Sequence, residues 1–253
     1  MITFIKKKIQ KSLNKFGYEI VNKNQTIVEL SNDDKNLINL VNKYSMTPKI
    51  RIYNLLQSLR HLKHKNVKGD YVECGVWKGG NLILFKKFLE NEKVIEEVKS
   101  IYGFDTFEGM TEPDENDFQI TNKIKAKDLF KTDTNKSSHL WGICKIDDVK
   151  NNLSKNLKDI DNINLIKGPV EQTLSIKENI PDCISLLRLD TDFYISTKKE
   201  LEVLYERVSP GGIIIIDDYG HWAGSKKAVD EFFKNKYVWM HYVDYACRLI
   251  IKD

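Results

Sequence analysis

Short apolar runs alternate with amphipathic stretches from residue 70 to the end of the sequence. Five runs have the length of strands, and helical patterns separate several of them. The runs cover residues 70–76, 100–105, 162–168, 183–190 and 211–218, and the helical patterns cover 77–92, 196–208 and 225–235. Residues 241–245 and 247–253 have the pattern of a closing pair of strands. This alternation predicts an α/β protein with a parallel sheet covered by helices on both faces.

The pattern also predicts a division of the chain into residues 1–69, an N-terminal helical region and cap, and 70–253, the main domain. Within 1–69, apolar residues recur at helical spacing at Ile2, Ile5, Ile9, Leu13 and Phe16, and lysines fill much of the other side. We expect a helix docked on its own domain or on a second subunit, with a membrane-surface helix as the alternative.

One long polar segment interrupts the main domain. Residues 106–150 lack strong periodicity, which is typical of a lid or an insertion next to a substrate.

Composition narrows the function classes. The chain has 253 residues, of which 41% are hydrophobic and 30% charged, as in an ordinary globular domain. No apolar run is long enough for a transmembrane helix, and the first residues lack the pattern of a signal peptide. We therefore expect a cytoplasmic protein without stable membrane insertion.

The balance of basic residues and cysteines adds two expectations. Of 40 basic residues 35 are Lys and five are Arg, whereas Arg is the usual residue for recognising bases and phosphates. We expect no nucleic-acid partner. Four cysteines lie far apart, and Cys74 and Cys183 fall inside apolar strand-like runs, so reduced thiols are predicted.

Polar residues stand at the end of every predicted strand of the main domain. In a parallel sheet these ends meet at one edge, which is where ligands bind. The residues are Glu73 and Gly75, Asp105, Gly168, Asp190, and the pair Asp217–Asp218.

The pair Asp217–Asp218 directly follows four isoleucines, and two adjacent carboxylates repel each other unless a cation lies between them. Asp190 ends the preceding strand, so three carboxylates are expected to converge. Three hard oxygen ligands suit a divalent ion: Mg²⁺ is expected, with Mn²⁺ and Fe²⁺ as alternatives. A set of helix caps and surface charges is the other interpretation.

The first two strand ends indicate a nucleoside site. Glycines in ECGVWKGG open a helix, where a ligand approaches the backbone, and Asp105 follows about thirty residues later. An acidic residue in that place accepts the hydroxyls of a ribose in dinucleotide folds. A tight turn and a strand-capping Asp are the structural alternatives.

Four blocks of the sequence resemble a known family. They are GDYVECGVWKGGN (69–81), GFDTFEGM with EPD (103–114), LLRLDTDFYIST (186–197) and IIIIDDYGHWAGSKKAVDEFF (213–233). Their order and spacing resemble the macrocin O-methyltransferase family, whose members are S-adenosylmethionine-dependent and metal-dependent enzymes that act on sugar hydroxyls. The resemblance runs from about Ser45 to the C-terminus.

The resemblance implies a class I methyltransferase fold, with a Rossmann-like, mostly parallel seven-stranded sheet whose last strand is antiparallel. It places the metal ligands on Asp190, Asp217 and Asp218. The residues expected to bind S-adenosylmethionine are Ser45, Met46, Glu73, Gly75, Val76, Trp77, Asn81, Asp105, Thr106, Phe107, Gly168 and Asp190. Those expected to contact the substrate are Tyr194, Tyr219, His221 and Trp222, with a core residue as the alternative for Tyr194 and a solvated loop residue as the alternative for His221.

The identity of the general base stays open at this point. Catechol-type relatives have a lysine three residues after the first metal ligand, where this chain has Phe193. A loop that commonly reads Gly-Ser-Trp in the family is Gly220–His221–Trp222 here. Asp190 and His221 are the two candidates for catalytic proton transfer.

The expected reaction is methylation of a sugar hydroxyl, on a nucleotide-linked sugar such as a heptose or deoxysugar of a bacterial capsule or surface polysaccharide, by a homo-oligomer. An antibiotic glycoside is the alternative acceptor. Two other classes are an inactive donor-binding scaffold for glycan assembly and an RNA methyltransferase. Three aspartates at the strand ends argue against the first, and the scarcity of Arg argues against the second.

Overall fold

A computed structural model describes residues 9, 13, 27–92, 98, 100–133 and 141–253 of the chain. It contains two compact units, Met1–Asn36 and Leu37–Asp253. Of the predicted N-terminal apolar face, Ile9 and Leu13 are helical, whereas Ile2, Ile5 and Phe16 lie outside the described residues. The docking of that face on the chain's own domain or on a second subunit therefore stays a prediction.

The helix α2 (Asn32–Val41) begins with a capping box. The backbone N–H of Asp34 donates to Oγ of Ser31 at 3.1 Å, and the N–H of Ser31 donates back to the Asp34 carboxylate at 3.4 Å. This reciprocal pair satisfies two donors that the first turn of a helix leaves free.

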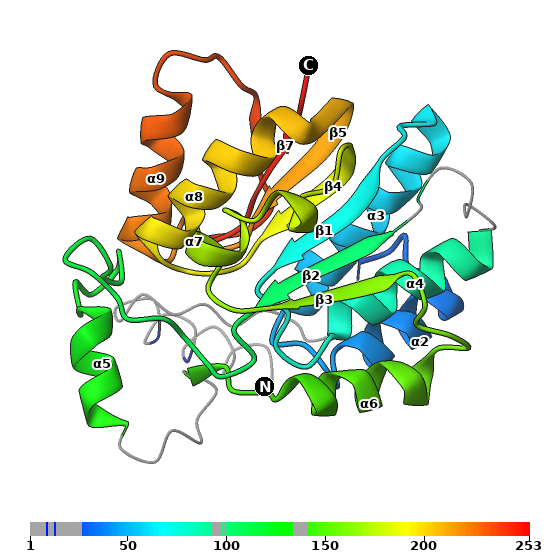
Figure 1. Cartoon of the computed structure of the whole chain (residues 1–253), viewed down its shortest axis with the longest axis horizontal. Coiled ribbons are helices and arrows are strands. Elements are labelled where there is room, and N and C mark those ends of the chain that lie inside the picture. Colours follow the sequence, from blue (N-terminus) through cyan, green and yellow to red (C-terminus); the bar gives the residue numbers. More distant parts are fainter. Residues whose placement is uncertain (1–8, 10–12, 14–26, 93–97, 99, 134–140) are drawn as a thin grey trace. The chain divides into compact units, whose positions relative to one another are not determined.

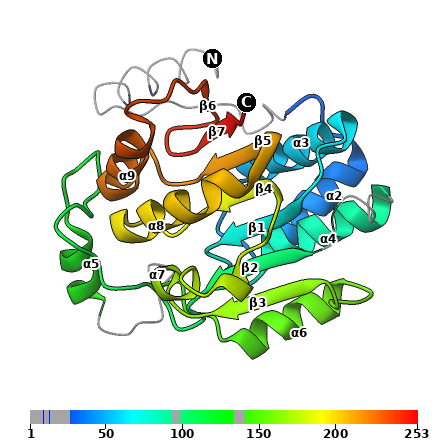
Figure 2. The ribbon, with the colours of Figure 1, turned by 45° about the horizontal axis from the view of Figure 1, so that its top comes forward.

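A seven-stranded sheet organises the second unit, in the order β3-β2-β1-β4-β5-β7-β6 (Figures 1 and 2). The first five strands are parallel, β7 is antiparallel to β5, and β6 is antiparallel to β7. This confirms the predicted fold class. The strands are β1 (Asp70–Cys74), β2 (Ile101–Asp105), β3 (Ile163–Lys167), β4 (Ile184–Leu189), β5 (Val208–Ile216), β6 (Met240–Tyr242) and β7 (Arg248–Ile251).

Helices cover both faces of the sheet. α7, α8 and α9 lie on one face, and α3, α4 and α6 lie on the other (Figure 1). The bounds are α3 (Lys49–Lys65), α4 (Gly80–Glu92), α5 (Ala126–Thr132), α6 (Ile146–Asn156), α7 (Val170–Thr173), α8 (Tyr194–Leu204) and α9 (Ala223–Phe233), with the 3-10 turns η2 (Lys177–Asn179) and η3 (Tyr205–Arg207).

The isoleucine run of β5 is buried on both faces because helices cover both. Ile214 and Ile216 pack in one core cluster with Leu201 of α8 and Val229 of α9. Ile213 and Ile215 point the opposite way, since side chains alternate along a strand. β5 begins at Val208, three residues before the start of the predicted run at 211–218.

The segment 106–150 contains more regular structure than the sequence predicted. It includes α5 and the first turn of α6, and α6 belongs to the helix layer of the sheet. Val149 and Leu153 of α6 are buried, and a Cβ at Gly79 would lie 3.2 Å from Cγ1 of Val149. The helix has three apolar residues, Ile146, Val149 and Leu153, and polar residues at its other eight positions, which is a weak pattern.

Two further observations concern the sequence-based expectations. Among the described residues, no helix has the length and apolar character needed to cross a lipid bilayer. Cys74 is buried in β1, but Cys183 is exposed just before β4, so its prediction as an apolar strand residue is wrong.

Candidate active site

A cavity of about 260 Å³ opens at the carboxyl ends of the parallel strands. This is the edge at which open parallel sheets bind ligands. Nine of the predicted site residues line it: Met46, Gly75, Trp77, Asp105, Thr106, Gly168, Asp190, Asp217 and Asp218. The structure thus brings together residues that are far apart in the sequence.

The loops around the cavity have left-handed backbone at several positions. The backbone angle φ is 49° at Trp77, 53° at Phe107 and 65° at Asp192. Residues other than glycine rarely adopt such values. At Gly75, with φ 90°, a Cβ would lie 2.1 Å from the carbonyl oxygen of Asp190. The loops after β1 and β4 therefore touch, and only glycine fits there. Such strain is common at functional sites.

Asp105 binds the loops after β1 and β2 to each other. Its Oδ2 accepts the N–H groups of Val76 at 2.8 Å and Trp77 at 2.9 Å, and its Oδ1 accepts the N–H of Phe107 at 2.7 Å. Burial raises the pKa of this carboxyl, and the backbone donors oppose the rise. The carboxylate therefore has a structural role in the loops, whatever it contacts in a ligand.

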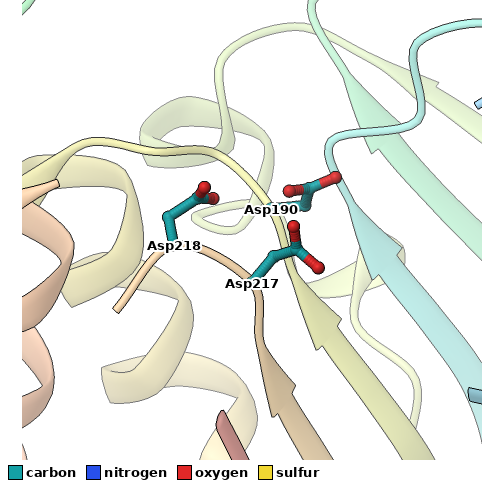
Figure 3. A group of neighbouring side chains, drawn as sticks. All are labelled: Asp190, Asp217 and Asp218. Atoms are coloured by element: carbon teal, nitrogen blue, oxygen red, sulfur yellow. The ribbon is translucent and has the colours of Figure 1, made fainter. Parts of the chain in front are cut away.

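Asp190, Asp217 and Asp218 gather at the ends of β4 and β5 (Figure 3). One oxygen of each carboxylate lies within 4.8 Å of the others. Burial raises the pKa of Asp190 and of Asp218 well above the usual range, and the neighbouring carboxylates raise it further. Oδ2 of Asp218 is buried and has no hydrogen-bond partner among the described residues.

Two arginines that the sequence did not reveal balance part of this charge. Arg188 of β4 donates from Nη1 to Glu73 at 2.8 Å and to Asp190 at 2.7 Å, and from Nη2 to Asp217 at 2.8 Å. Burial alone would lower the pKa of Arg188, but the surrounding carboxylates hold it above the usual range. A charge inside the apolar run SLLRLD was the signal that could have identified it.

Arg51 of α3 is a second arginine partner of Asp217. Its Nη1 lies 2.5 Å from Oδ2 of Asp217, and its Nε lies 2.7 Å from Oδ2 of Asp244, between β6 and β7. Both oxygens of Asp217 are thereby bound by arginines. No pattern near residue 51 marks this role, because the partners are remote in sequence.

Carboxylates still outnumber arginines on this wall. Asp192 also lines the cavity, and burial with the nearby charge of Asp190 raises its pKa to about 7. The excess of buried oxygen ligands and the unpaired Oδ2 of Asp218 fit a divalent cation, which binds hard oxygen donors.

Several predicted donor-binding residues lie behind the cavity wall. Ser45, Glu73, Val76, Asn81 and Phe107 do not line it. Glu73 is fully buried, where it accepts from Arg188 and from Nδ2 of Asn81 at 2.8 Å, and burial raises its pKa to about 7. Glu73, Val76, Asn81 and Phe107 are buried, so their side chains support the elements around the cavity instead of lining it.

Ser45 acts through a neighbour. Its Oγ donates to Oγ1 of Thr47 at 2.7 Å, and Thr47 lines the cavity and accepts from Nη2 of Arg188 at 3.1 Å.

Three of the predicted substrate residues are also not on the wall. The hydroxyl of Tyr194 donates to Glu231, and that of Tyr219 donates to Asp230, both on α9 at 2.7 Å. Trp222 is buried against Ala126 and Phe193. Their side chains pack the helices that follow β4 and β5, and this packing turns them away from the cavity.

His221 is half-buried and does not line the cavity. Its Nδ1 lies 3.3 Å from the hydroxyl of Tyr245, and its Nε2 lies 3.5 Å from Nε2 of Gln119. Burial and the charge of Arg51 lower its pKa, so the imidazole is neutral at neutral pH.

Comparisons with known proteins identify the family of the chain. The sequence model of the family Macrocin-O-methyltransferase (TylF) matches residues 3–249. Demethyldecarbamoylnovobiocin O-methyltransferase of Streptomyces niveus is 29% identical over 191 residues, which cover 76% of this chain and 68% of that protein. Mycinamicin III 3''-O-methyltransferase of Micromonospora griseorubida is 26% identical over 169 residues, which cover 67% of this chain and 62% of that protein.

Solved structures show the same architecture. The O-methyltransferase NovP superposes with a TM-score of 0.69 and 26% identity, covering 83% of this chain and 82% of that one. The calicheamicin methyltransferase CalS11 has a TM-score of 0.58 and 18% identity, covering 92% and 99%, and shows the shared fold. This chain therefore belongs to the macrocin O-methyltransferase family of S-adenosylmethionine-dependent methyltransferases.

Proposed function

We propose that this chain methylates a sugar hydroxyl and that Asp190, Asp217 and Asp218 hold a divalent cation for that reaction. The observation that carries the proposal is the set of three carboxylates within 4.8 Å of one another, on the wall of the cavity. The unpaired Oδ2 of buried Asp218 supports it, since a buried charged oxygen is costly without a partner.

The opposite wall supports binding of S-adenosylmethionine. Gly75 and Trp77 expose backbone at the start of the turn before α4, and Asp105, Thr106 and Gly168 border the same space. A Cβ at Gly75 would fill part of the contact between the two walls. These residues would hold the donor so that its methyl group faces the three carboxylates.

The cation supplies Lewis-acid chemistry that lowers the pKa of an alcohol and orients its oxygen. Mg²⁺ suits three carboxylates best, and Mn²⁺ and Fe²⁺ are the alternatives. The chain's own contribution is to hold both reactants close together in the cavity, which removes much of the entropic cost of the encounter.

Asp190 is the better candidate for the general base. It lines the cavity, whereas His221 does not. Arg188 donates to Oδ2 of Asp190, so Oδ1 is the atom that we assign to receive the proton of the acceptor hydroxyl. His221 contacts Tyr245 and Gln119, neither of which lines the cavity.

For the acceptor, we propose a nucleotide-linked or polymer-bound sugar, such as a heptose or deoxysugar of a bacterial surface glycan, methylated in the cytoplasm. The lysine-rich composition supports it, because it indicates an AT-rich bacterial genome. A second candidate is an antibiotic glycoside, which the names of the relatives favour. The predicted homo-oligomer remains an expectation.

The test is release of S-adenosylhomocysteine with a panel of nucleotide sugars and antibiotic glycosides, with and without EDTA. We expect release with one acceptor class, abolished by EDTA and restored by Mg²⁺ or Mn²⁺. Release that EDTA leaves unchanged would exclude the cation. Turnover of glycosides alone would exclude the surface-glycan acceptor.

A further inference from the structure

The segment 106–150, called the insertion from here on, contains a buried carboxylate that does not line the cavity. Asp117 is 1% exposed. Its Oδ1 accepts the N–H of Tyr194 at 2.9 Å, and its Oδ2 accepts the N–H of Asp114 at 2.8 Å. Its carbonyl oxygen accepts the N–H of Ala126, the first residue of α5. The side chain thus connects a turn of the insertion with the first residue of α8.

The first turn of α9 packs against the carboxylate of Asp117. A Cβ at Gly224 would lie 1.9 Å from Oδ1 of Asp117 and 2.9 Å from the backbone nitrogen of Tyr194. The N–H of Ala223 also donates to the carbonyl of Phe118 at 2.9 Å. A side chain at position 224 would therefore separate the first turns of α8 and α9 from the insertion.

Both of these helices begin a few residues after a proposed metal ligand. α8 begins at Tyr194, shortly after Asp190, and α9 begins at Ala223, shortly after Asp218. The two helices pack along each other on one face of the sheet (Figure 2). A shift of either first turn would move the short loop that carries the carboxylates, because so few residues separate them.

A helix start does not need a partner from so far away. Ser, Thr, Asp or Asn at the N-cap serves that purpose in most helices, but the N-cap of α8 is Phe193, which makes no side-chain hydrogen bond. The acceptor comes instead from a residue 77 positions earlier in the chain. Burial raises the pKa of Asp117 to about 6, so the carboxylate is largely ionised at neutral pH and favours the positive end of the α8 dipole.

We propose that Asp117 is a positioning residue that fixes the loops carrying Asp190, Asp217 and Asp218 by holding the first turns of α8 and α9 together. The part of the insertion around Asp117 is then held in place by the first turns of α8 and α9. Its position in turn determines the geometry of the carboxylates. The part of this inference that concerns cation binding rests on the proposed function.

Three variants test the coupling: Asp117→Ala, Asp117→Asn and Gly224→Ala. The matched control is Asp128→Asn, an exposed insertion residue on α5 that lies 3.9 Å from Lys131. Titration with Mn²⁺ measures the carboxylate site, titration with S-adenosylhomocysteine measures the donor wall, and hydrogen exchange measures the loops directly, without a cation.

We expect Asp117→Ala and Gly224→Ala to weaken Mn²⁺ binding about tenfold, equivalent to about 1.4 kcal/mol, while S-adenosylhomocysteine binding stays within about twofold. Amides of 190–196 and 217–226 should exchange faster, and those of β1 and β2 should not. Asp117→Asn should lie between, since its amide oxygen keeps the bond from Tyr194 and its other atom no longer accepts from Asp114. Should Asp117→Ala not fold, Asp117→Asn decides with the same measurements.

Unchanged exchange at both loops in Asp117→Ala and Gly224→Ala would overturn the proposal. An even increase across the whole sheet would also overturn it, because that is the result of a general loss of stability. If the wild-type chain itself binds no Mn²⁺, the proposed cation site fails, and the exchange pattern still decides whether Asp117 positions the loops.

Discussion

The two halves of the cavity are held together in different ways. In the donor half, formed by the loops at 75–80 and 105–109, Asp105 is bound by backbone N–H groups of those same loops. In the acidic half, formed by the loops at 190–193 and 217–222, Asp217 is bound by arginine side chains from α3 and β4. The donor half is therefore held by backbone donors, whereas the acidic half is held by charged side chains.

The largest effect should come from removing one charge of the acidic half. We expect Asp218→Asn to lower turnover by about 1000-fold, equivalent to about 4 kcal/mol of barrier, while S-adenosylhomocysteine binding stays within about twofold. Asp218 is a cleaner choice than Asp217, whose removal would take one partner from each of two arginines. Release assays and calorimetry measure the two quantities.

The control for this variant is Asp230→Asn on α9, which accepts from Tyr219 and Lys226 at the surface. Its turnover should match the wild type. Equal losses in Asp218→Asn and Asp230→Asn, or a wild-type rate in Asp218→Asn, would show that the acidic half is not the reaction centre.

Removing the central arginine should cost stability more than any surface change. Arg188→Met leaves Glu73, Asp190 and Asp217 buried without their shared partner, and breaking such a buried pair costs about 3–5 kcal/mol. Adding Glu73→Gln should recover part of the loss. Urea unfolding of both variants measures this.

Arg207→Met is the matched control, because Arg207 is 41% exposed and lies 3.8 Å from Asp182. An exposed pair contributes about 1 kcal/mol at most. A similar loss in Arg188→Met and Arg207→Met would mean that the buried network contributes nothing special.

A single glycine joins the halves, so changing it should affect both. Gly75→Ala places a Cβ 2.1 Å from the carbonyl oxygen of Asp190 and keeps a left-handed φ. We expect about tenfold weaker binding of both S-adenosylhomocysteine and Mn²⁺. Gly211→Ala is the control: its φ is also positive, but it lies near the start of β5 and does not line the cavity. Loss of donor binding alone in Gly75→Ala would contradict the contact between halves.

Removing the outer arginine should strengthen cation binding. Arg51 lies 2.5 Å from Oδ2 of Asp217, so Arg51→Met frees that oxygen and removes a repelling charge. We expect Mn²⁺ to bind several-fold to about tenfold more tightly. Arg60→Met on the same helix, which loses a bond to Gln57, should leave the affinity unchanged. Weaker binding in Arg51→Met would mean that Arg51 positions Asp217 more than it competes with the cation.

The smallest effect concerns pH and the insertion. Burial raises the pKa of Asp117 to about 6 from its usual 3.8, with Asp114 as the charged neighbour. Its protonated form is therefore favoured by folding, and that contribution is lost as the pH rises through about 6. The melting temperature of the wild type should fall more between pH 4.5 and 7 than that of Asp117→Asn. Parallel curves would show that Asp117 titrates as in the unfolded chain.

Sequence patterns predicted the strand-end residues of both halves, because their place at the end of a strand can be read from the chain. Gly75, Asp105 and the three aspartates all line the cavity. The carboxylates of Asp190, Asp217 and Asp218 could be placed at one sheet edge, because parallel strands bring their ends together. Their arginine partners could not, since they come from elements whose packing is settled only in three dimensions.

Three of the predicted substrate residues do not line the cavity. Tyr194, Tyr219 and Trp222 follow the acidic strand ends closely in sequence, which suggested contact with a substrate. The helices that begin there rotate these side chains toward α9 and the insertion. Arg188 did leave a signal, because a lysine-rich chain has only five arginines and one of them interrupts a buried strand.

The need for glycine at position 224 has a practical consequence for protein engineering. A graft that replaces residues 106–133 has to carry an acidic residue where Asp117 stands, and the recipient has to keep glycine at 224. Chimeras that match one without the other would place a Cβ against a buried carboxylate, or leave a helix start without its acceptor.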